Sequence, residues 1–489
     1  MKPTILTTFD TMTQNLRGSR GWGMLHHVIM EPYRLISRAS LTDETLASAN
    51  ISNYAHGIWN NGGSLEEAFY ALGKLGGDDS SIQIYKYNAT TEGWDTLANA
   101  SSSSGSLDYT KFFYFEGFLY GYRLNAVIWR FGDTRDTSTN TFTDGWKTGS
   151  WTYSTQPVVV GANAYFAMDN EVYELATGGS SLSLRFTLSS DRYITSLANR
   201  GQALSVMTYS TSTRTSKEFL FSLGDVTITN AYDSIDWGSG KVVHHAESNG
   251  VILAVQNERV ANLGDYNDGS VKLKRSVGSS IETVHEIRGS SLSIIGGYKK
   301  VFEDALLFGL KYEQNNDTFD GICSFDSTGR MYFPFTTEYD TTDFLGVRGF
   351  DIYGNTWFVS HSSGSVIRTG SGTKYKSTAI TRKIDNGDPL LKKQVNGASV
   401  YFTPMTSITT DYVKLYYKDQ DQTSWTLLNQ IAGSATNEGV DRLSAVKDTN
   451  GNPLRPYKER QYKIEFVGVD LLGFRTGTPK PISDEPYTV

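Results

Sequence analysis

The sequence has few of the features that mark several large classes of protein. Cys323 is the only cysteine among 489 residues, which excludes an intramolecular disulfide and gives no sign of a cysteine metal site. The N-terminal segment has one early lysine but no apolar core of a secretion signal. Apolar runs such as 305–310 are far too short to cross a membrane. We therefore expect neither a secretion signal of this type nor a membrane span.

Charge is also sparse. Charged residues make up 20% of the chain, the formal net charge is −7, and no run of lysine or arginine is long enough to follow a phosphate backbone. Nucleic acid is therefore not an expected partner. Together with the single cysteine, this composition favours assembly in a cytoplasm.

The residues that are abundant favour strands and tight turns. Aromatic residues make up 13% of the chain, and there are 47 glycines. Aromatic and β-branched side chains fit a pleated surface, while glycine and asparagine supply turns with positive φ. The composition predicts an all-β protein.

A loose repeat accounts for most of the length. Each unit has an apolar strand, a small turn, a second apolar strand and, after a polar linker, a third. The turns are at Gly62-Gly63, Glu116-Gly117, Ala162-Asn163, Arg200-Gly201, Asn249-Gly250, Glu303-Asp304 and Tyr353-Gly354. The second strands begin "AFYALGKL", "FLYGYR", "AYFAM", "ALSVMTY", "VILAVQ", "ALLFGL" and "TWFVS", and the third are "IQIYKY", "AVIWRF", "EVYEL", "EFLFSL", "ERVANL", "GICSF" and "SVIRTG".

The spacing of these units matches a four-stranded propeller blade. Successive turns are 38 to 54 residues apart, close to the roughly 40 to 50 residues of such a blade. A single twisted sheet cannot bury both faces, whereas sheets packed radially cover one another. We predict a seven-bladed β-propeller over residues 47–373.

One unit resembles a blade of a kelch-type propeller. In "FYALGKLGGDDSSIQIYKYNATTEGWDTL", the pair Gly76-Gly77 precedes Tyr87 and Trp94, which have six residues between them. The other six units lack this pattern, so the resemblance supports a propeller and not membership of the kelch family.

Two further segments share one turn pattern. "FDSTGRMYF" (325–333) and "FDIYGNTWF" (350–358) both have Phe-Asp, two residues, glycine, two residues and an aromatic residue. We interpret both as hairpin turns in which the aspartate caps its own backbone and the glycine adopts positive φ. They resemble the Asp-box of sialidase-type propellers, which has one residue fewer between the aspartate and the glycine.

The two ends differ from the repeat. Residues 1–46 read as an extended polar arm leading into the first blade, where such a strand often completes the last blade of a propeller; the arm could also reach a neighbouring subunit. In residues 374–489 apolar and polar residues alternate, as at 413–418 and 462–466, without the blade spacing. We predict a separate β-sandwich-like domain there.

The order of these parts resembles a known group of proteins. A glycine-containing arm with Pro32-Tyr33, a loose propeller and a final module with "VKLYYKDQDQTSWTLL" are similar to uncharacterised structural proteins of tailed bacteriophages, especially propeller components of the tail and its tip. The resemblance implies a virion protein assembled in the host cytoplasm. It supplies no site residue.

Motifs that carry chemistry are weak. The seven histidines are at 26, 27, 56, 244, 245, 285 and 361, without H-E-x-x-H spacing, and the adjacent pairs would face opposite ways on a strand. The loop 264–270 offers Asp265, Asn267 and Asp268 as oxygen ligands, but its glycine is one position early for an EF-hand and the glutamate is missing. We assign no catalytic, cofactor-binding or metal-binding residue and expect no cofactor.

Tryptophans are the remaining candidates for contacts. Most aromatic residues in repeats belong to the core. The tryptophans considered for stacking on sugars or proteins are Trp59, Trp129, Trp146, Trp151 and Trp237. Trp146 and Trp151 are the better candidates because they lie in the Gly/Thr-rich stretch "TDGWKTGSWTY".

The sequence thus favours a non-enzymatic virion protein of the tail or tail tip. Expected partners are other virion proteins and copies of the chain itself, with a host-surface glycan or protein as a further candidate. The alternative is a glycan-binding or sialidase-like glycoside hydrolase propeller. Three converging arginines and a carboxylate pair in the central cleft would favour that alternative.

Overall fold

The structure is a computed structural model of the whole chain, built of β-strands joined by turns. It describes residues 5–6, 22–26, 28–31, 34–37, 41–44, 49–75, 81–101, 111–122, 127–136, 140–149, 151, 153–179, 181–201, 203–222, 231, 233–258, 270–278, 280–288, 290–314, 317–336, 347–361, 366–370, 376–385, 392–395, 397–477 and 479–481. The all-β prediction is confirmed for these residues. No helix capable of crossing a membrane occurs among them.

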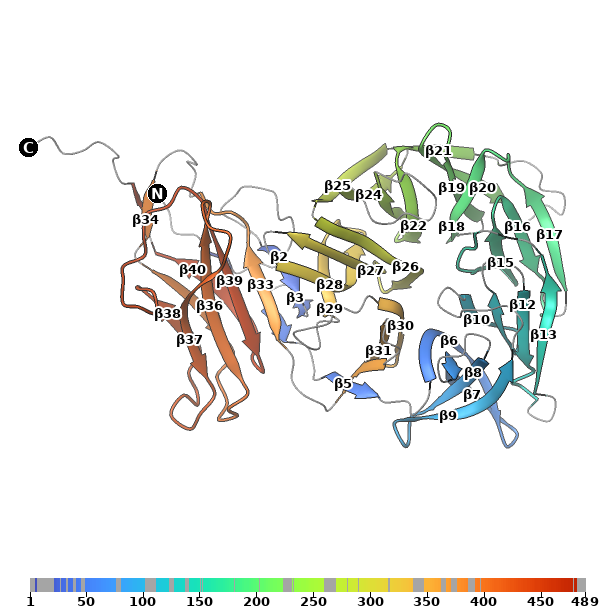
Figure 1. Cartoon of the computed structure of the whole chain (residues 1–489), viewed down its shortest axis with the longest axis horizontal. Coiled ribbons are helices and arrows are strands. Elements are labelled where there is room, and N and C mark those ends of the chain that lie inside the picture. The colour runs from blue at the N-terminus through green and yellow to red at the C-terminus, as the bar shows by residue number, and fades with distance from the viewer. Residues whose placement is uncertain are drawn as a thin grey trace, which may run out of the picture. The chain divides into compact units, whose positions relative to one another are not determined.

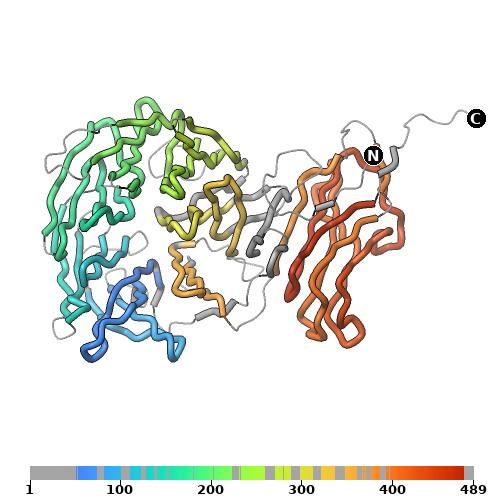
Figure 2. The backbone as a smooth tube through the Cα atoms, turned by 180° about the vertical axis from the view of Figure 1, so that it is seen from behind, coloured from blue at the N-terminus to red at the C-terminus, as the bar shows by residue number. Residues whose placement is uncertain are grey.

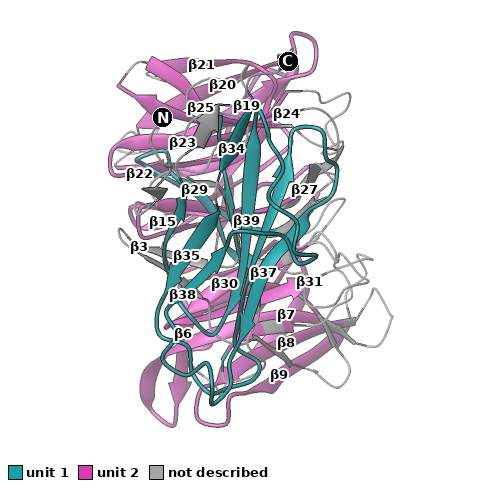
Figure 3. Ribbon diagram, turned by 90° about the vertical axis from the view of Figure 1, so that its left-hand side faces the viewer, with its two compact units in different colours: residues 1–41, 313–341, 370–489 teal, residues 42–312, 342–369 magenta. Residues whose placement is uncertain are grey.

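The chain divides into two compact units, coloured separately in Figure 3. The first, here called the ring unit, comprises Thr42–Tyr312 and Thr342–Thr369. The second, here called the paired-sheet unit, comprises Met1–Leu41, Glu313–Thr341 and Gly370–Val489. The sequence analysis places one boundary at residue 373 and treats the N-terminal arm as a separate part. In the structure, each unit is instead built from two or three separate segments of the chain.

The ring unit contains six four-stranded sheets. In sheet order their strands are β6 (Ala49–Asn61), β7 (Ser64–Leu75), β8 (Ser81–Asn88) and β9 (Gly93–Ser101); β10 (Lys111–Phe115), β11 (Phe118–Tyr122), β12 (Val127–Gly132) and β13 (Thr141–Thr148); β14 (Val158–Val160), β15 (Asn163–Met168), β16 (Glu171–Leu175) and β17 (Leu182–Thr187); β18 (Arg192–Arg200), β19 (Ala203–Ser210), β20 (Thr215–Ser222) and β21 (Asp233–Ser239); β22 (Lys241–Ser248), β23 (Val251–Asn257), β24 (Ser270–Val277) and β25 (Ser280–Arg288); and β30 (Val347–Tyr353), β31 (Thr356–His361), β32 (Val366–Thr369) and β5 (Leu41–Glu44). A further pair is β26 (Ser290–Phe302) and β27 (Ala305–Gln314).

Tight turns join the first two strands of each of these groups. At Glu116-Gly117 and Asn249-Gly250 both residues have positive φ, with values of 48° and 88° in the first turn and 52° and 76° in the second. This backbone matches the right-handed twist of a two-residue hairpin, and glycine adopts it without steric cost. Hairpin turns occur at or within one residue of all seven predicted positions.

The first strands of the groups lie side by side in a circle, visible in Figures 1 and 2. We call β6, β10, β14, β18, β22, β26 and β30 the ring strands. Strand β6 contacts β10 and β30, β18 contacts β14 and β22, and β26 contacts β22 and β30. The remaining neighbours, β10 and the β14–β17 sheet, meet through Phe113 and Phe166, whose ring centroids are 6.3 Å apart.

Apolar side chains fill the spaces between neighbouring sheets. One cluster joins the β6–β9 sheet to the β10–β13 sheet through buried residues that include Tyr70, Leu72, Leu119 and Trp129. Equivalent clusters occupy the next interfaces along the circle. The second, third and fourth sheets therefore have apolar residues on both faces, and burial of such residues supplies the main cohesion of the ring unit.

The paired-sheet unit has two larger sheets and one small pair. One sheet has the strand order β28 (Asp317–Asp326), β29 (Met331–Thr336), β2 (Trp22–His26), β33 (Ser377–Thr381), β39 (Arg460–Val467), β36 (Tyr412–Asp419) and β37 (Thr426–Ala432). The other has β3 (Val28–Glu31), β4 (Arg34–Ser37), β40 (Leu471–Thr476), β35 (Ala398–Phe402) and β38 (Arg442–Ala445), with β1 (Ile5–Leu6) also on β40, and the pair is β34 (Lys393–Val395) with β41 (Pro479–Pro481). Tyr462 and Phe474 place their rings 4.8 Å apart between the two sheets.

The N-terminal residues supply strands to both units. Strand β5 is the fourth strand of the β30–β32 sheet, as expected for a strand that completes the last blade. In contrast, β1 pairs with β40 and β2 lies between β29 and β33. The described part of the arm therefore pairs with strands of its own chain.

The two Phe-Asp turns differ in structure. Asp326 caps its own turn as predicted, because its Oδ1 accepts hydrogen bonds from the amides of Thr328 and Arg330, at 2.9 Å each, while Gly329 has a φ of 90°. In the second segment Gly354 also has positive φ, 58°. Asp351 Oδ1 accepts a hydrogen bond from the adjacent Ile352 amide at 2.7 Å, but its carboxylate also contacts Lys300 and His56 on other ring strands.

One predicted strand is in the wrong place. We predicted "ERVANL" (258–263) as the third strand of its unit, but the strand that pairs with β23 is β24, Ser270–Val277. Strand β24 has the half-buried pattern that was expected of the third strand. Val271 and Leu273 are buried, and the polar residues that follow each of them are partly exposed. Residues 259–263, the Gly76-Gly77 pair and the loop residues Asp265, Asn267 and Asp268 lie outside the described residues.

Candidate functional site

Side chains from two ring strands meet at one buried carboxylate on a third. Asp351 on β30 is 3% exposed, and its Oδ1 accepts a hydrogen bond from Lys300 Nζ on β26. The Nε2 atom of His56 on β6 lies 3.1 Å from the same oxygen. Burial alone would raise the pKa of Asp351, but the hydrogen bond to His56 and the charge of Lys300 outweigh it, and the net pKa lies below its usual value.

The adjacent residue on β26, Lys299, makes a second set of hydrogen bonds to other strands. Adjacent residues of a strand point to opposite sides, and Lys299 faces β18 and β22 while Lys300 faces β30. Lys299 Nζ donates hydrogen bonds to Ser196 Oγ at 2.8 Å, to the Leu197 carbonyl at 2.5 Å and to the His245 carbonyl. Its backbone amide donates to Gln156 Oε1 at 2.7 Å. Lys299 thus connects four sequence-distant segments at the centre of the ring strands.

The environment of Lys299 weakens its charge. Burial lowers the pKa of its ammonium group to about 7. Neutral or charged, the amine keeps its two carbonyl partners, and Ser196 Oγ can serve as acceptor or donor. The amine is therefore suited to remain in place across neutral pH.

Histidines of β22 belong to a buried polar network. His245 Nε2 is 2.9 Å from Ser205 Oγ, which donates to Glu218 Oε1 at 2.6 Å, and Trp237 Nε1 donates to Glu218 Oε2 at 3.1 Å. Burial and the neighbouring Lys299 hold the pKa of His245 well below its usual value. His244 packs on the other side, with its ring 6.4 Å from Phe308. The two rings therefore face different sheets, as predicted for adjacent histidines, and within the described residues no group of three metal-binding side chains occurs.

A cavity of about 510 Å³ opens beside Lys299. It lies where β18, β22 and β26 end at their hairpin turns, and Asn199, Glu247, Asn249 and Val301 line it together with Lys299. We call this cavity the turn-face pocket. Its described lining contains one carboxylate, Glu247, and no arginine, which differs from the arginine triad and carboxylate pair required by the sialidase-like alternative.

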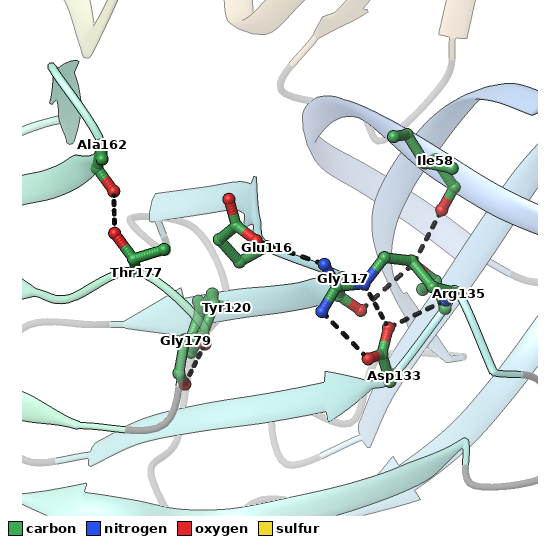
Figure 4. A network of polar contacts seen from close by, with 10 residues as sticks. Ile58, Glu116, Gly117, Tyr120, Asp133, Arg135, Ala162, Thr177 and Gly179 are labelled. Atoms are coloured by element: carbon green, nitrogen blue, oxygen red, sulfur yellow. Dashed lines mark hydrogen bonds and ion pairs between the residues drawn. The ribbon is translucent and has the colours of Figure 1, made fainter. Parts of the chain in front are cut away.

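A separate polar network joins the first two sheets (Figure 4). Arg135, in the segment after β12, contacts Glu116 Oε2 at 3.2 Å and Asp133 Oδ1 at 3.1 Å. Thr134 Oγ1 donates to the Ile58 carbonyl at 2.7 Å. Because Arg135 and Glu116 are each about one-third exposed, their ion pair adds little stability, and the backbone-directed bonds are the firmer connection.

The same sheet is tied to the next one along the circle. Tyr120 OH donates to the Gly179 carbonyl at 2.6 Å, as Figure 4 also shows. Burial raises the pKa of Tyr120 far above its usual value, so this phenol remains a donor. Tyr122 OH donates to the Thr155 carbonyl. These bonds carry the polar connection from the second sheet to the third.

The tryptophans divide between core and surface. Trp129, Trp151 and Trp237 are buried at 2%, 8% and 1% exposure, so the expectation that Trp151 is a contact residue is wrong. Trp151 packs against Tyr173 between sheets, with centroids 6.0 Å apart. Trp146 is half-buried on β13, the outermost strand of its sheet, and Arg130 and Lys147 lie over its ring at 5.2 Å and 5.6 Å. Trp59 is also half-buried.

The Tyr-Trp pair of the kelch-like stretch is also internal. Tyr87 and Trp94 lie opposite one another on β8 and β9, with ring centroids 5.2 Å apart. Both pack against Phe358 of β31. The two aromatic residues whose spacing indicated a blade therefore lie in the contact between the first and last sheets of the circle.

Comparisons with known proteins add little at the level of sequence. No family model and no curated protein matches the chain. Among solved structures, the N-terminal domain of Nup159 aligns with a TM-score of 0.44 at 11% identity, covering 71% of this chain and 99% of that one. Raptor from Chaetomium thermophilum aligns with a TM-score of 0.44 at 10% identity, covering 71% and 30%, and YjhT with 0.37 at 10%, covering 59% and 98%.

Proposed function

We propose that the ring unit is a seven-bladed β-propeller and that the paired-sheet unit is a β-sandwich. The seven ring strands, each with a hairpin-linked second strand, support the number of blades. Contact between β6 and β30 supports closure of the circle. For the sandwich, the buried side chains of Tyr462, Ile464 and Phe466 on β39 and the ring contact between Tyr462 and Phe474 support two sheets packed face to face.

This protein, we infer, is a non-enzymatic structural component of a tailed-phage virion. It belongs to the tail or tail tip, assembles in multiple copies in the host cytoplasm, and contacts other virion proteins and a host-surface glycan or protein. The observation that carries the proposal is the use of charged groups as ties between sheets. Asp351 joins β6, β26 and β30, and Lys299 joins β26 to β18, to β22 and to Gln156 just before β14.

Such ties suit a rigid platform. Buried charged groups that accept and donate several hydrogen bonds fix one arrangement of the elements that carry them, because any other arrangement leaves them unpaired. A platform of this kind leaves its loops and outer strands free to bind partners. The resemblance of the arm, propeller and final strand-rich module to phage tail proteins selects the virion among the possible settings for such a platform.

Particle composition and genetic complementation test this proposal. In the phage that encodes the chain, we expect an amber mutation in its gene to block infectivity and the plasmid-borne chain to restore it. Purified particles should contain the protein in several copies per portal complex by quantitative mass spectrometry. Absence from washed particles, or catalytic turnover of a sialylated or other host-surface glycan by the purified chain, would contradict the proposal.

A further inference from the structure

The turn-face pocket has the size and lining of a small-ligand site. Its volume of about 510 Å³ falls in the range of about 300–1,000 Å³ typical of such sites. Pro157, Val158, Leu197, Ala246 and Val301 supply apolar walls. These walls can hold the hydrocarbon part of a ligand.

The polar lining of the pocket includes a carboxylate oxygen that has no hydrogen-bond partner. Glu247 Oε2 is buried and accepts no hydrogen bond. Asn199 uses its Nδ2 to donate to the Val159 carbonyl at 3.1 Å, which leaves its Oδ1 as an acceptor. A buried carboxylate oxygen without a donor is costly, and a ligand that donates to it would remove that cost.

Lys299 does not reverse this preference. Its three amine contacts are all with protein acceptors, Ser196, Leu197 and His245, so the donors of its side chain point at the wall rather than into the cavity. An anionic ligand would therefore meet the unpaired carboxylate of Glu247 without gaining a free donor from Lys299. A cationic donor meets a matching partner.

We propose that the turn-face pocket binds a small ligand with an ammonium or guanidinium group on a short apolar stem. The cationic group pairs with the carboxylate of Glu247, and the stem packs against Val158, Leu197 and Val301. This site is independent of the virion proposal, because it follows from the cavity and its lining alone.

Calorimetric titration of the full chain with n-butylguanidinium tests the site, with n-butylurea as the neutral probe of the same shape. At about pH 8 we expect saturable binding of n-butylguanidinium and roughly tenfold weaker binding of n-butylurea, because only the cation forms a charge-assisted hydrogen bond with Glu247. Glu247→Gln should weaken n-butylguanidinium binding by about tenfold or more. Glu67→Gln, which changes an exposed carboxylate on β7, should leave it unchanged.

Val301→Trp provides a second, independent variant. Val301 lies at the pocket and is 44% exposed, so a larger side chain there can fill the cavity without entering the core. It should abolish binding of both probes while the melting temperature stays near that of the wild type. The proposal is overturned if n-butylguanidinium does not bind, if the two probes bind equally, or if Glu247→Gln and Val301→Trp bind like the wild type.

Discussion

Lys300 on β26 donates a hydrogen bond to the buried carboxylate of Asp351 on β30. The two residues are 51 positions apart in the chain, and His56 of β6 approaches the same carboxylate. This contact therefore joins the last ring strands to the first. The contact occurs where the chain enters and leaves the circle. At this point non-covalent contacts must hold the first and last sheets together.

Replacing Asp351 with asparagine should weaken the ring unit. Asn keeps one acceptor but loses the charge that pairs with Lys300 and His56, which are themselves partly exposed. We expect Asp351→Asn to lower the free energy of unfolding by about 1–3 kcal/mol in urea titrations. The control Asp95→Asn, at an exposed position on β9, should change it by less than about 0.5 kcal/mol. Equal stability of the two variants would show that the contacts of Asp351 do not stabilise the ring unit.

Stability should rise as the pH increases from 7 toward 10. Burial lowers the pKa of Lys299 to about 7 and that of Lys111 to about 8, from the usual 10.5 of a lysine. Between these values and 10.5 the unfolded chain binds more protons than the folded chain, so the free energy of unfolding increases with pH, by at most about 1.4 kcal/mol per pH unit for each lysine.

Urea unfolding at about pH 7 and pH 9 measures this dependence. Lys299→Met should remove the share that belongs to Lys299 and leave that of Lys111. Above pH 10 the trend should reverse, because burial raises the pKa of tyrosines such as Tyr85 to about 12 and the unfolded chain then loses protons that the folded chain keeps. A free energy of unfolding that is flat or falling between pH 7 and 9 would contradict the burial of these amines.

The two tryptophans of the "GWKTGSW" stretch should differ in their contribution to stability. Trp151 is in the core between the second and third sheets, so Trp151→Ala should cost about 3–5 kcal/mol. Trp146 is half-buried beneath Arg130 and Lys147, so Trp146→Ala should cost about 1 kcal/mol. Thermal melts of both variants check this order, and the reverse order would refute the assignment of core and surface.

Gly121 has a packing requirement that a matched glycine lacks. A Cβ atom at Gly121 would overlap the indole ring of Trp129 on the neighbouring strand, whereas one at Gly93 would meet Thr91 Oγ1 at an ordinary 3.5 Å. We expect Gly121→Ala to cost about 1–3 kcal/mol and Gly93→Ala to be nearly neutral in urea unfolding. Similar stability of the two variants would mean that Trp129 has room to move.

The sequence predicted the local features of the fold better than its long-range pairing. Hairpin turns follow from residues that tolerate positive φ, such as Gly117 and Gly250, and those are visible in a single sequence. The Asp326 turn is equally local. In contrast, Asp351 has the same local pattern, and only the positions of Lys300 and His56 decide that its carboxylate serves as a tie.

Strand partners and burial were predicted less well for a related reason. The placement of β2 between β29 and β33 depends on segments more than 300 residues away, which no local pattern encodes. A glycine- and threonine-rich stretch suggested an exposed Trp151, but the neighbouring sheet covers it. The turn-face pocket combines single residues from several sheets, so neither Lys299 nor Glu247 stood out in the sequence.

The most direct test of the central proposal is a cryo-EM reconstruction of the particle of the phage that encodes this chain. We predict density for several symmetry-related copies at the tail or tail tip, each with seven sheets around a closed circle and Lys300 beside Asp351. Absence of the chain from the particle, or copies in which the circle has a different number of sheets, would contradict the account.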